Sequence, residues 1–177
     1  MILFHGTNMK IGNIDFDKSR LRTDFGKGFY LSDKLGNARD WAIDKSSISE
    51  TPTVMHYEIN KAILSDDSIS RLRFDSPTLE WLNFVRDNRQ KTTNSMSNKE
   101  PRHSYDIVSG PIANDKVAIA VEKYCRGKLS AEETLLEVKA IKNVFQLSMH
   151  TQLVLSYIQS VSYSQFINKR WSEWKNS

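Results

Sequence analysis

Three short segments hold the residues of this sequence that are best suited to chemistry. His5-Gly6-Thr7 follows the apolar run Ile2-Leu3-Phe4 near the start of the chain. Gly26-Lys27-Gly28 precedes an aromatic stretch, and a late His150-Thr151-Gln152 places an imidazole two residues before an amide. A histidine can exchange a proton near neutral pH, and a glycine lets the backbone approach a ligand closely. These segments are therefore the candidates for a reactive site.

Taken singly, each segment is also typical of ordinary structure. His5 can end an edge strand before a turn, and a glycine hairpin can leave Lys27 exposed. The Gly-Lys-Gly run is not a Walker A loop, because no four-residue spacer and Lys-Ser/Thr follow, and it is not a dinucleotide-binding fingerprint. Trp41, on the face of an expected helix, is more typical of a core than of a cofactor platform. The order of the segments has to decide between these interpretations.

The elements that would position these segments are predicted from hydrophobic spacing, turn residues and capping residues. Strands are predicted over residues 1–7, 29–32, 53–59 and 105–108, with two or three more between 144 and 166. Helices are predicted over residues 35–42, 77–85, 115–127 and 131–141. Ser130 and Glu133 fit a capping box, and Ser76-Pro77 fits a helix start whose inward residues begin at Leu79. Strands and helices mixed irregularly, with strands at both ends, predict an α+β fold.

The composition fits one globular domain over residues 1–177. The chain has 177 residues, of which 39% are hydrophobic and 26% charged, and this length supports a core without a disulfide or metal. We expect the core to span about residues 2–165, with a polar C-terminal tail over residues 166–177. In that tail Trp171 and Trp174 lie one helical turn apart, either docked on the body or available to a partner.

Charge and cysteine content exclude several classes of protein. The 25 basic residues face 21 acidic ones in an interspersed pattern, which favours a solvated surface over a polyanionic partner. No apolar run approaches the roughly 20 residues of a membrane span, and the N-terminus does not resemble a signal peptide. A single cysteine, Cys125, excludes an internal disulfide and an all-cysteine metal site. We expect a core role for Cys125, a cytoplasmic protein, no metal and no membrane partner.

The order and spacing of the segments resembles the diphtheria-toxin-like branch of the ADP-ribosyltransferases, which includes the poly(ADP-ribose) polymerases. That branch has a first-strand His-Gly-Ser/Thr, a Gly-Lys-Gly-aliphatic-Tyr segment and a second aromatic, matched here by Trp41, which lies 11 residues after Tyr30. The resemblance is closer to DUF3990, an uncharacterised bacterial family of this superfamily, in residues 5–7, 24–31 and 105–115 and in the late His-x-Gln. The resemblance covers about residues 2–165 and implies a split mixed sheet with flanking helices.

The resemblance implies NAD as the substrate, with His5, Tyr30 and Gln152 as the catalytic triad. Tyr30 and Trp41 would enclose nicotinamide between aromatic faces, and the backbone of Gly6 would bind its carboxamide. His5 would bind the adenosine ribose. The other implied NAD contacts are Thr7, Arg20, Gly26, Lys27, Gly28, Phe29, Asn114 and Asp115. Of these, Arg20 and Lys27 are diphosphate partners or surface charges, and Asn114-Asp115 is a turn with a helix cap or a source of negative charge near the ribose.

Three positions depart from the polymerases. Gln152 stands where they have a glutamate, and an amide stabilises a cationic transition state less than a carboxylate does. His150 stands where arginine-modifying members place glutamate or glutamine. On a strand it would share a face with Gln152, either as an acceptor-facing base or as a histidine hydrogen-bonded at a strand edge. Ala38 stands where the polymerases have a nicotinamide-binding serine. Chain elongation is therefore not expected, while transfer of one unit, NAD hydrolysis and loss of catalysis stay open.

The expected function is an NAD-dependent mono-ADP-ribosyltransferase, acting as an intracellular bacterial toxin or effector. Its acceptor would be a macromolecule, either protein or nucleic acid, and an antitoxin protein is a possible partner. The polar segment 91–103 is expected to contact the acceptor. The alternatives are an NAD glycohydrolase, in which His150 activates water, and a catalytically weak module that binds NAD or ADP-ribose.

Overall fold

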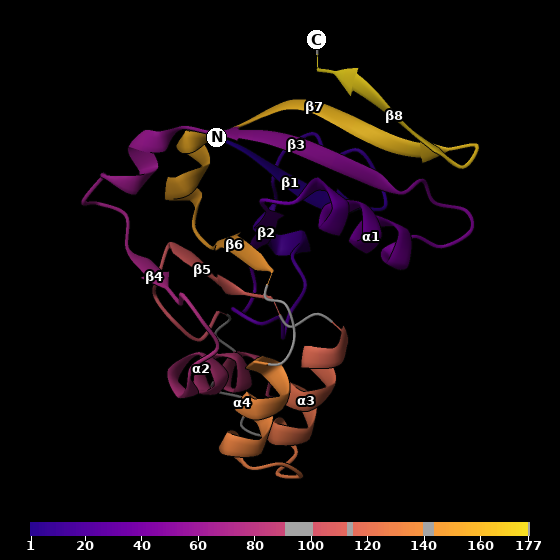
Figure 1. Ribbon diagram of the computed structural model, residues 1–177. Coiled ribbons are helices and arrows are strands. Elements are labelled where there is room, and N and C mark those ends of the chain that lie inside the picture. The colour runs from indigo at the N-terminus through magenta and orange to yellow at the C-terminus, as the bar shows by residue number, and fades with distance from the viewer. Residues whose placement is uncertain (91–100, 113–114, 140–143, 177) are drawn as a thin grey trace. The chain divides into compact units, whose positions relative to one another are not determined.

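The computed structural model describes residues 1–90, 101–112, 115–139 and 144–176 (Figure 1). Helices and strands alternate irregularly, and both parallel and antiparallel strand pairs occur, so the chain has the predicted α+β fold with mixed sheet pairing. The chain divides into two compact units. The first unit comprises residues 1–15, 30–69 and 151–177, and the second comprises residues 16–29 and 70–150. That these units form one domain stays a prediction.

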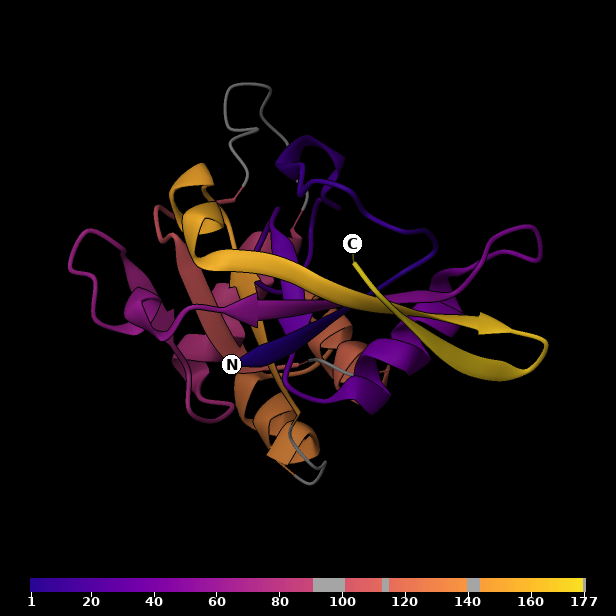
Figure 2. The same cartoon turned by 90° about the horizontal axis from the view of Figure 1, so that it is seen from above.

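The first unit is built on an antiparallel sheet in the order β2-β1-β3-β7-β8 (Figure 2). Its strands are β1 (Ile2–Thr7), β2 (Phe29–Ser32, of which Phe29 is counted with the second unit), β3 (Thr53–Ile59), β7 (Ile158–Ile167) and β8 (Arg170–Lys175). Two 3₁₀ helices, η2 (Lys61–Leu64) and η4 (Gln152–Tyr157), belong to the same unit. The predicted strand over 53–59 is confirmed, and Val54 and Met55 in it are fully buried.

Helix α1 (Leu35–Lys45) packs on β1 and β3 of this sheet. Ala38 and Ala42 form a buried cluster with Val54 of β3, and their small size brings the helix close to the strands. The closest approach is at Gly6, where an added Cβ would lie 2.2 Å from the carbonyl oxygen of Ala38. No Cβ fits at that distance, so Gly6 is required by the packing of α1.

The second unit combines three strands with a group of three helices. Strands β4 (Arg71–Arg73) and β5 (Ile107–Pro111) are parallel, and β5 and β6 (Phe145–Met149) are antiparallel. Helices α2 (Leu79–Arg89), α3 (Asp115–Cys125) and α4 (Ala131–Lys139) lie side by side (Figure 1). Trp81, Leu82 and Val85 of α2 are fully buried. The short η1 (Phe16–Lys18) completes the unit.

Local signals in the second unit have mixed outcomes. The capping box is confirmed, because the Ser130 N–H donates to Glu133 Oε2 over 2.8 Å and the Glu133 N–H donates to Ser130 Oγ over 3.2 Å. The predicted start of α2 is wrong, because Thr78 is the N-cap and accepts the Trp81 N–H. Leu79, predicted to face inward, is 51% exposed, and the buried face of α2 begins at Trp81.

The C-terminal residues form a strand, so the predicted helical spacing of the two tryptophans is wrong. Asn168 and Lys169 make a tight turn, and residues 170–175 return along β7 as β8. Residues three apart on a strand point to opposite faces. Trp171 accordingly packs with Phe166 and the α1 cluster, while Trp174 stacks on Tyr163 with ring centroids 5.6 Å apart. The predicted helix over 131–141 ends at Lys139, and Ile141 lies outside the described residues.

Candidate functional site

The imidazole of His5 links β1 to β2 in the first unit. His5 Nδ1 lies 2.7 Å from the backbone oxygen of Tyr30. A carbonyl oxygen only accepts, so Nδ1 carries the proton and Nε2 is the acceptor nitrogen of the neutral ring. Burial lowers the pKa of His5 below its ordinary value, although the bond to Tyr30 opposes this shift. The ring is therefore neutral at pH 7, with a hydrogen-bond acceptor at Nε2.

The strands diverge next to this bond. β1 aligns with β3 over all six of its residues, whereas its alignment with β2 covers only the pair Phe4 and Ser32. Met1 and Ile59 exchange both of their backbone hydrogen bonds at 2.8 Å, and such pairs alternate along an antiparallel ladder. The N–H and C=O of Gly6 therefore point away from β3, toward the side on which β2 leaves the ladder. This position therefore has an imidazole, from His5, and a backbone N–H and C=O, from Gly6.

The other predicted residues of the first unit are less closely organised. Tyr30 and Thr7 are half-buried, and the Thr7 hydroxyl lies 3.5 Å from Asn8 Oδ1. Trp41 is 49% exposed, and the Lys45 ammonium lies 4.5 Å from the centre of its ring. Whether Trp41 contacts nicotinamide stays a prediction. Ala38, at the expected serine position, lies in the core beneath Gly6.

Gln152 does not lie on a strand. β6 ends at Met149, and Gln152 is the exposed first residue of η4. The expectation that Gln152 and His150 share a strand face is therefore wrong. The physical reason is that η4 buries Val154 while leaving Leu153 47% exposed, a pattern that resembles strand alternation in the sequence. The role of Gln152 in a triad stays a prediction.

The Gly-Lys-Gly loop of the second unit is held by contacts within its own chain. Gly26 has a φ of +81°, in the region that favours glycine. A Cβ on Gly28 would lie 2.6 Å from Nδ1 of His150. The Lys27 ammonium lies 3.4 Å from the exposed carboxylate of Asp17. Packing explains both glycines without a ligand.

The remaining residues of the second unit that were predicted to contact NAD differ in exposure and in the elements that carry them. Phe29 is buried and Arg20 is exposed. Asp115 is the first residue of α3, and Asn114 lies outside the described residues. Their contacts with NAD stay predictions.

His150 is enclosed by the second unit. Its Nδ1–H donates to the Lys27 carbonyl over 2.8 Å, and its Nε2 accepts from the Ser148 hydroxyl over 2.7 Å. Burial lowers the pKa of His150 to about 4. This effect is larger than that of the hydrogen bond to the Lys27 carbonyl, which raises the pKa. These contacts give the ring a positioning role for the loop around Lys27. They correspond to the hydrogen-bonded alternative and do not support an acceptor-facing base that works near neutral pH.

His103 is a half-buried histidine whose role the sequence interpretation missed. It was expected in a polar segment that contacts an acceptor, but its Nε2–H donates to the Phe25 carbonyl over 2.8 Å and its Nδ1 accepts the Tyr105 N–H. The ring of His103 meets that of His150 edge-on, with centroids 4.6 Å apart. The two histidines thus fix two carbonyls of the loop at residues 25–27. Residues 91–100 of this segment lie outside the described residues.

Two further polar clusters were not predicted. In the second unit, the buried carboxylate of Asp24 pairs with Arg89 and accepts from Gln146 Nε2 over 3.0 Å. In the first unit, His56 is buried between Ser164 and Ser162, with each hydroxyl oxygen 2.9 Å from one of its ring nitrogens. Neither cluster has a spacing that sequence alone would reveal, because its members come from separate elements.

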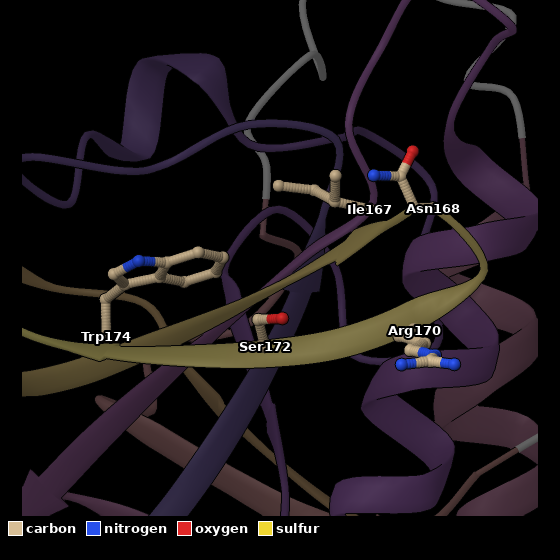
Figure 3. A pocket seen from close by; sticks show the side chains of 5 residues that line it. All are labelled: Ile167, Asn168, Arg170, Ser172 and Trp174. Carbon is tan, nitrogen blue, oxygen red and sulfur yellow. The ribbon is translucent and has the colours of Figure 1, made fainter.

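Two surface hollows of the described residues lie apart from His5. One, of about 470 Å³, lies at the β7–β8 hairpin beside Trp174 (Figure 3). Another, of about 200 Å³, lies beside Lys10 and Asn176. We place the candidate site at the divergence of β1 and β2 because buried hydrogen-bonding groups converge there. The hollow drawn in Figure 3 is lined by no histidine, cysteine or carboxylate of the described residues.

Two features are absent from the described residues. None of the helices in that part of the chain is both long enough and apolar enough to cross a membrane. Within the same residues, no group of three or more histidine, cysteine, aspartate or glutamate side chains could hold a metal ion. The expectation of a metal-free protein stays a prediction.

Comparison with known proteins leaves the activity open. No curated protein matches the chain, and no solved structure matches it. Residues 1–160 match the family model described as a protein of unknown function, DUF3990, and because this match covers most of the sequence the chain belongs to that family.

Proposed function

We propose that this chain binds NAD where β1 and β2 diverge and transfers its ADP-ribose unit to a macromolecular acceptor. The observation that carries the proposal is the bond from His5 Nδ1 to the Tyr30 carbonyl, beside a glycine whose backbone polar groups point away from β3. The resemblance in the sequence supplies the substrate class, and the local geometry supplies groups that suit it. A role as a cytoplasmic toxin or effector with an antitoxin stays a prediction.

The groups of this site match the polar groups of nicotinamide riboside. A carboxamide has an acceptor oxygen and two N–H donors, so one residue's N–H and C=O can bind it. Gly6 offers both, and its missing side chain is needed by α1 rather than by the ligand. The neutral ring of His5 has Nε2 as its acceptor nitrogen, a group of the type that binds a ribose hydroxyl, and the half-buried Tyr30 has an aromatic ring that suits nicotinamide.

The proposed reaction breaks one bond and forms one. The glycosidic C–N bond of NAD breaks, and its electron pair leaves with nicotinamide, which gives a ribosyl oxocarbenium cation. A nucleophilic atom of the acceptor then bonds to the ribose carbon and releases its proton to solvent. Groups that hold the ribose hydroxyls in place lower the barrier by orientation and by stabilising positive charge.

A binding module without transferase activity is the second candidate, and one observation favours it. Gln152, expected to stabilise the reacting ribose from a strand, is exposed at the start of η4. The other polar side chain expected there, His150, is buried and hydrogen-bonded at both ring nitrogens. NAD hydrolysis with His150 as the base loses its motivating observation for the same reason.

Incubation with NAD labelled in the adenylate part distinguishes these functions. We expect label on protein or nucleic acid of an added cell lysate. Free labelled ADP-ribose without a labelled macromolecule would indicate a hydrolase, and retention of intact NAD would indicate a binding module. Absence of NAD binding at millimolar concentration would overturn the proposal.

A matched pair of histidine variants tests the site itself. His5→Ala should lower NAD turnover, or NAD affinity in a module, by about 100-fold, because it removes a positioned ribose contact. His56→Asn also removes a buried histidine of the first unit, but one that is bonded to two serines of β7. It should retain NAD turnover. Equal losses in both folded variants would contradict the assignment to His5.

A further inference from the structure

The outer edge of β8 presents backbone groups that its own ladder does not use. Asn168 and Lys169 have φ angles of +51° and +62°, which identifies a two-residue turn of type I′. Ile167 and Arg170 flank that turn and form the hydrogen-bonded closing pair, after which bonded and non-bonded pairs alternate. The backbone groups of Arg170, Ser172 and Trp174 thus face β7, and those of residues 171 and 173 face outward.

No strand of the described residues covers this edge. β8 is the last strand in the sheet order, and Figures 1 and 2 show it as the outermost strand of the first unit. An uncovered edge offers N–H and C=O groups to an extended chain, which can add to the sheet as a further strand.

One face of β8 is occupied by contacts within the chain. Trp171 packs on Phe166, with ring centroids 5.4 Å apart, and the Arg39 guanidinium lies 5.1 Å from its ring centre. Glu173 accepts the Ser162 hydroxyl over 2.8 Å and lies 3.4 Å from His56 Nδ1. Side chains of an added strand on this face would meet a surface that is already packed.

The opposite face of β8 is hollow and partly apolar. The hollow of about 470 Å³ is lined by Ile167, Asn168, Arg170, Ser172 and Trp174 (Figure 3). Ile167 and Trp174 are 42% and 39% exposed, so its wall includes apolar surface that water reaches. A branched or aromatic side chain from an added strand would bury that surface.

The charge around this hollow is positive. Lys169 and Arg170 are exposed, while Glu173, the carboxylate of β8, is bonded to Ser162 on the other face. Lys175, two residues after Glu173, shares that other face. Lys10 adds an ammonium 4.3 Å from the ring centre of Tyr163, on which Trp174 stacks. This charge favours an acidic segment. It disfavours a second copy of the same edge, because an antiparallel pair of β8 strands would place Arg170 of both copies on one face of the sheet, while Glu173 of both copies would lie on the other face.

We propose that β8 is a docking edge for an extended acidic segment of a partner protein. The segment adds beside β8 and bonds to the backbone of Trp171 and Glu173. It inserts one apolar side chain into the hollow at Trp174 and places carboxylates near Lys169 and Arg170. This inference is independent of NAD binding.

Synthetic nine-residue peptides test the proposal on the full chain. One set alternates Glu with Val, Leu, Ile or Phe, a control set has Lys in place of Glu, and a third has N-methylated backbone amides. Acidic peptides should bind and slow hydrogen exchange at the amides of Trp171 and Glu173. Arg170 and Trp174 amides, which already bond to β7, should change little. Failure of every acidic peptide to bind at millimolar concentration would overturn the proposal, as would equal binding of the N-methylated set.

Variants of the hairpin provide the matched control. Arg170→Glu should weaken binding of the acidic peptide at least about 10-fold, since it reverses an exposed charge at the site. Lys61→Glu reverses an exposed charge on η2 and should leave binding unchanged. Trp174→Ala should also weaken binding about 10-fold by removing the apolar wall. Equal effects of the two charge reversals would contradict a local site, and concentration-dependent dimers abolished by Arg170→Glu would instead assign the edge to a second copy.

Discussion

Gly6 in the first unit and Gly28 in the second are both pressed against their own chain, but by different groups. A Cβ at Gly6 would meet the backbone of α1 at 2.2 Å, whereas one at Gly28 would meet the His150 ring at 2.6 Å. Only Gly6 also directs backbone polar groups toward a strand that diverges from it. A glycine in a motif thus indicates that another group lies close to its backbone. The structure shows whether that group belongs to the protein, and whether the glycine also has backbone polar groups directed toward a position for a ligand.

The two units also differ in net charge. The second unit has 17 lysines and arginines against 12 aspartates and glutamates, while the first has eight against nine. The net charge of +4 of the whole chain therefore originates in the second unit. The candidate site around His5 lies in the unit without a basic surplus, so the overall basicity is not evidence for binding of the NAD diphosphate there.

The largest effect should come from Gly6→Ala. The added Cβ would overlap backbone atoms of α1, which cannot move as a side chain can, so we expect a loss of more than about 3 kcal/mol in the free energy of unfolding. Denaturant unfolding measures this loss. Gly36→Ala is the control, because an added Cβ there meets nothing within 4 Å and alanine favours the helix by about 1 kcal/mol. Similar stability of the two variants would contradict the close approach at Gly6.

The next effect is the dependence of stability on pH. The pKa of His150 is about 4 in the folded chain, below its ordinary value of 6.5, so between these values the unfolded state binds more protons. Stability should be greatest above pH 6.5 and fall toward pH 4, by up to about 3 kcal/mol from this group. His5, His56 and His103 also have lowered pKa values and act in the same direction.

His150→Gln tests this contribution to the pH dependence. The variant should unfold more easily at pH 7, because glutamine does not reproduce both hydrogen bonds of the ring, and its stability should decline less steeply between pH 6.5 and 4. Urea unfolding at several pH values supplies the comparison. An unchanged slope would show that His150 is not enclosed as the structure has it.

Much of the fold was predictable from local patterns. The alternation over residues 53–59 and the capping box at Ser130 and Glu133 are local signals, and both are confirmed. The prediction for the tail was wrong because Trp171 and Trp174 fit helical spacing. The turn at Asn168-Lys169 makes the tail a hairpin, and this turn lacks the usual glycine. Tertiary pairing with β7 overrides the local pattern.

The candidate site was predictable in part. His5, Gly6 and Tyr30 were identified as residues, but the hydrogen bond between His5 and the Tyr30 carbonyl depends on how two strands separate. For His150 the sequence left two roles open, an acceptor-facing base and a hydrogen-bonded histidine. It could not decide between them, because the burial of the ring depends on Lys27 and Ser148, which form no motif with it. Such contacts bring together residues up to 123 positions apart, beyond the reach of periodicity.

Gly28→Ala should have an intermediate effect, and a second substitution should relieve it. The new Cβ would meet mainly a side chain, so we expect a loss of about 2 kcal/mol, less than at Gly6. In Gly28→Ala/His150→Ala the clash with the ring is absent. The double variant should therefore be more stable than the sum of the single losses, by about 1 kcal/mol in a double-mutant cycle. Simple additivity would indicate that Gly28 is constrained by the Met149 carbonyl, 2.8 Å from the same position, and not by His150.

The smallest effect should come from the β7–β8 turn, where it separates stability from docking. Lys169 has a φ of +62°, which costs a residue with a Cβ roughly 1 kcal/mol, so Lys169→Gly should raise the thermal midpoint by about 2–4 °C. Asn168→Gly relieves a smaller cost, because asparagine tolerates this conformation, and it leaves the charge in place. If the hairpin binds acidic segments through its charge, Lys169→Gly should bind the acidic peptides more weakly despite its greater stability, while Asn168→Gly should not. Weaker binding by both variants would indicate that the turn's shape, and not the lysine, determines docking.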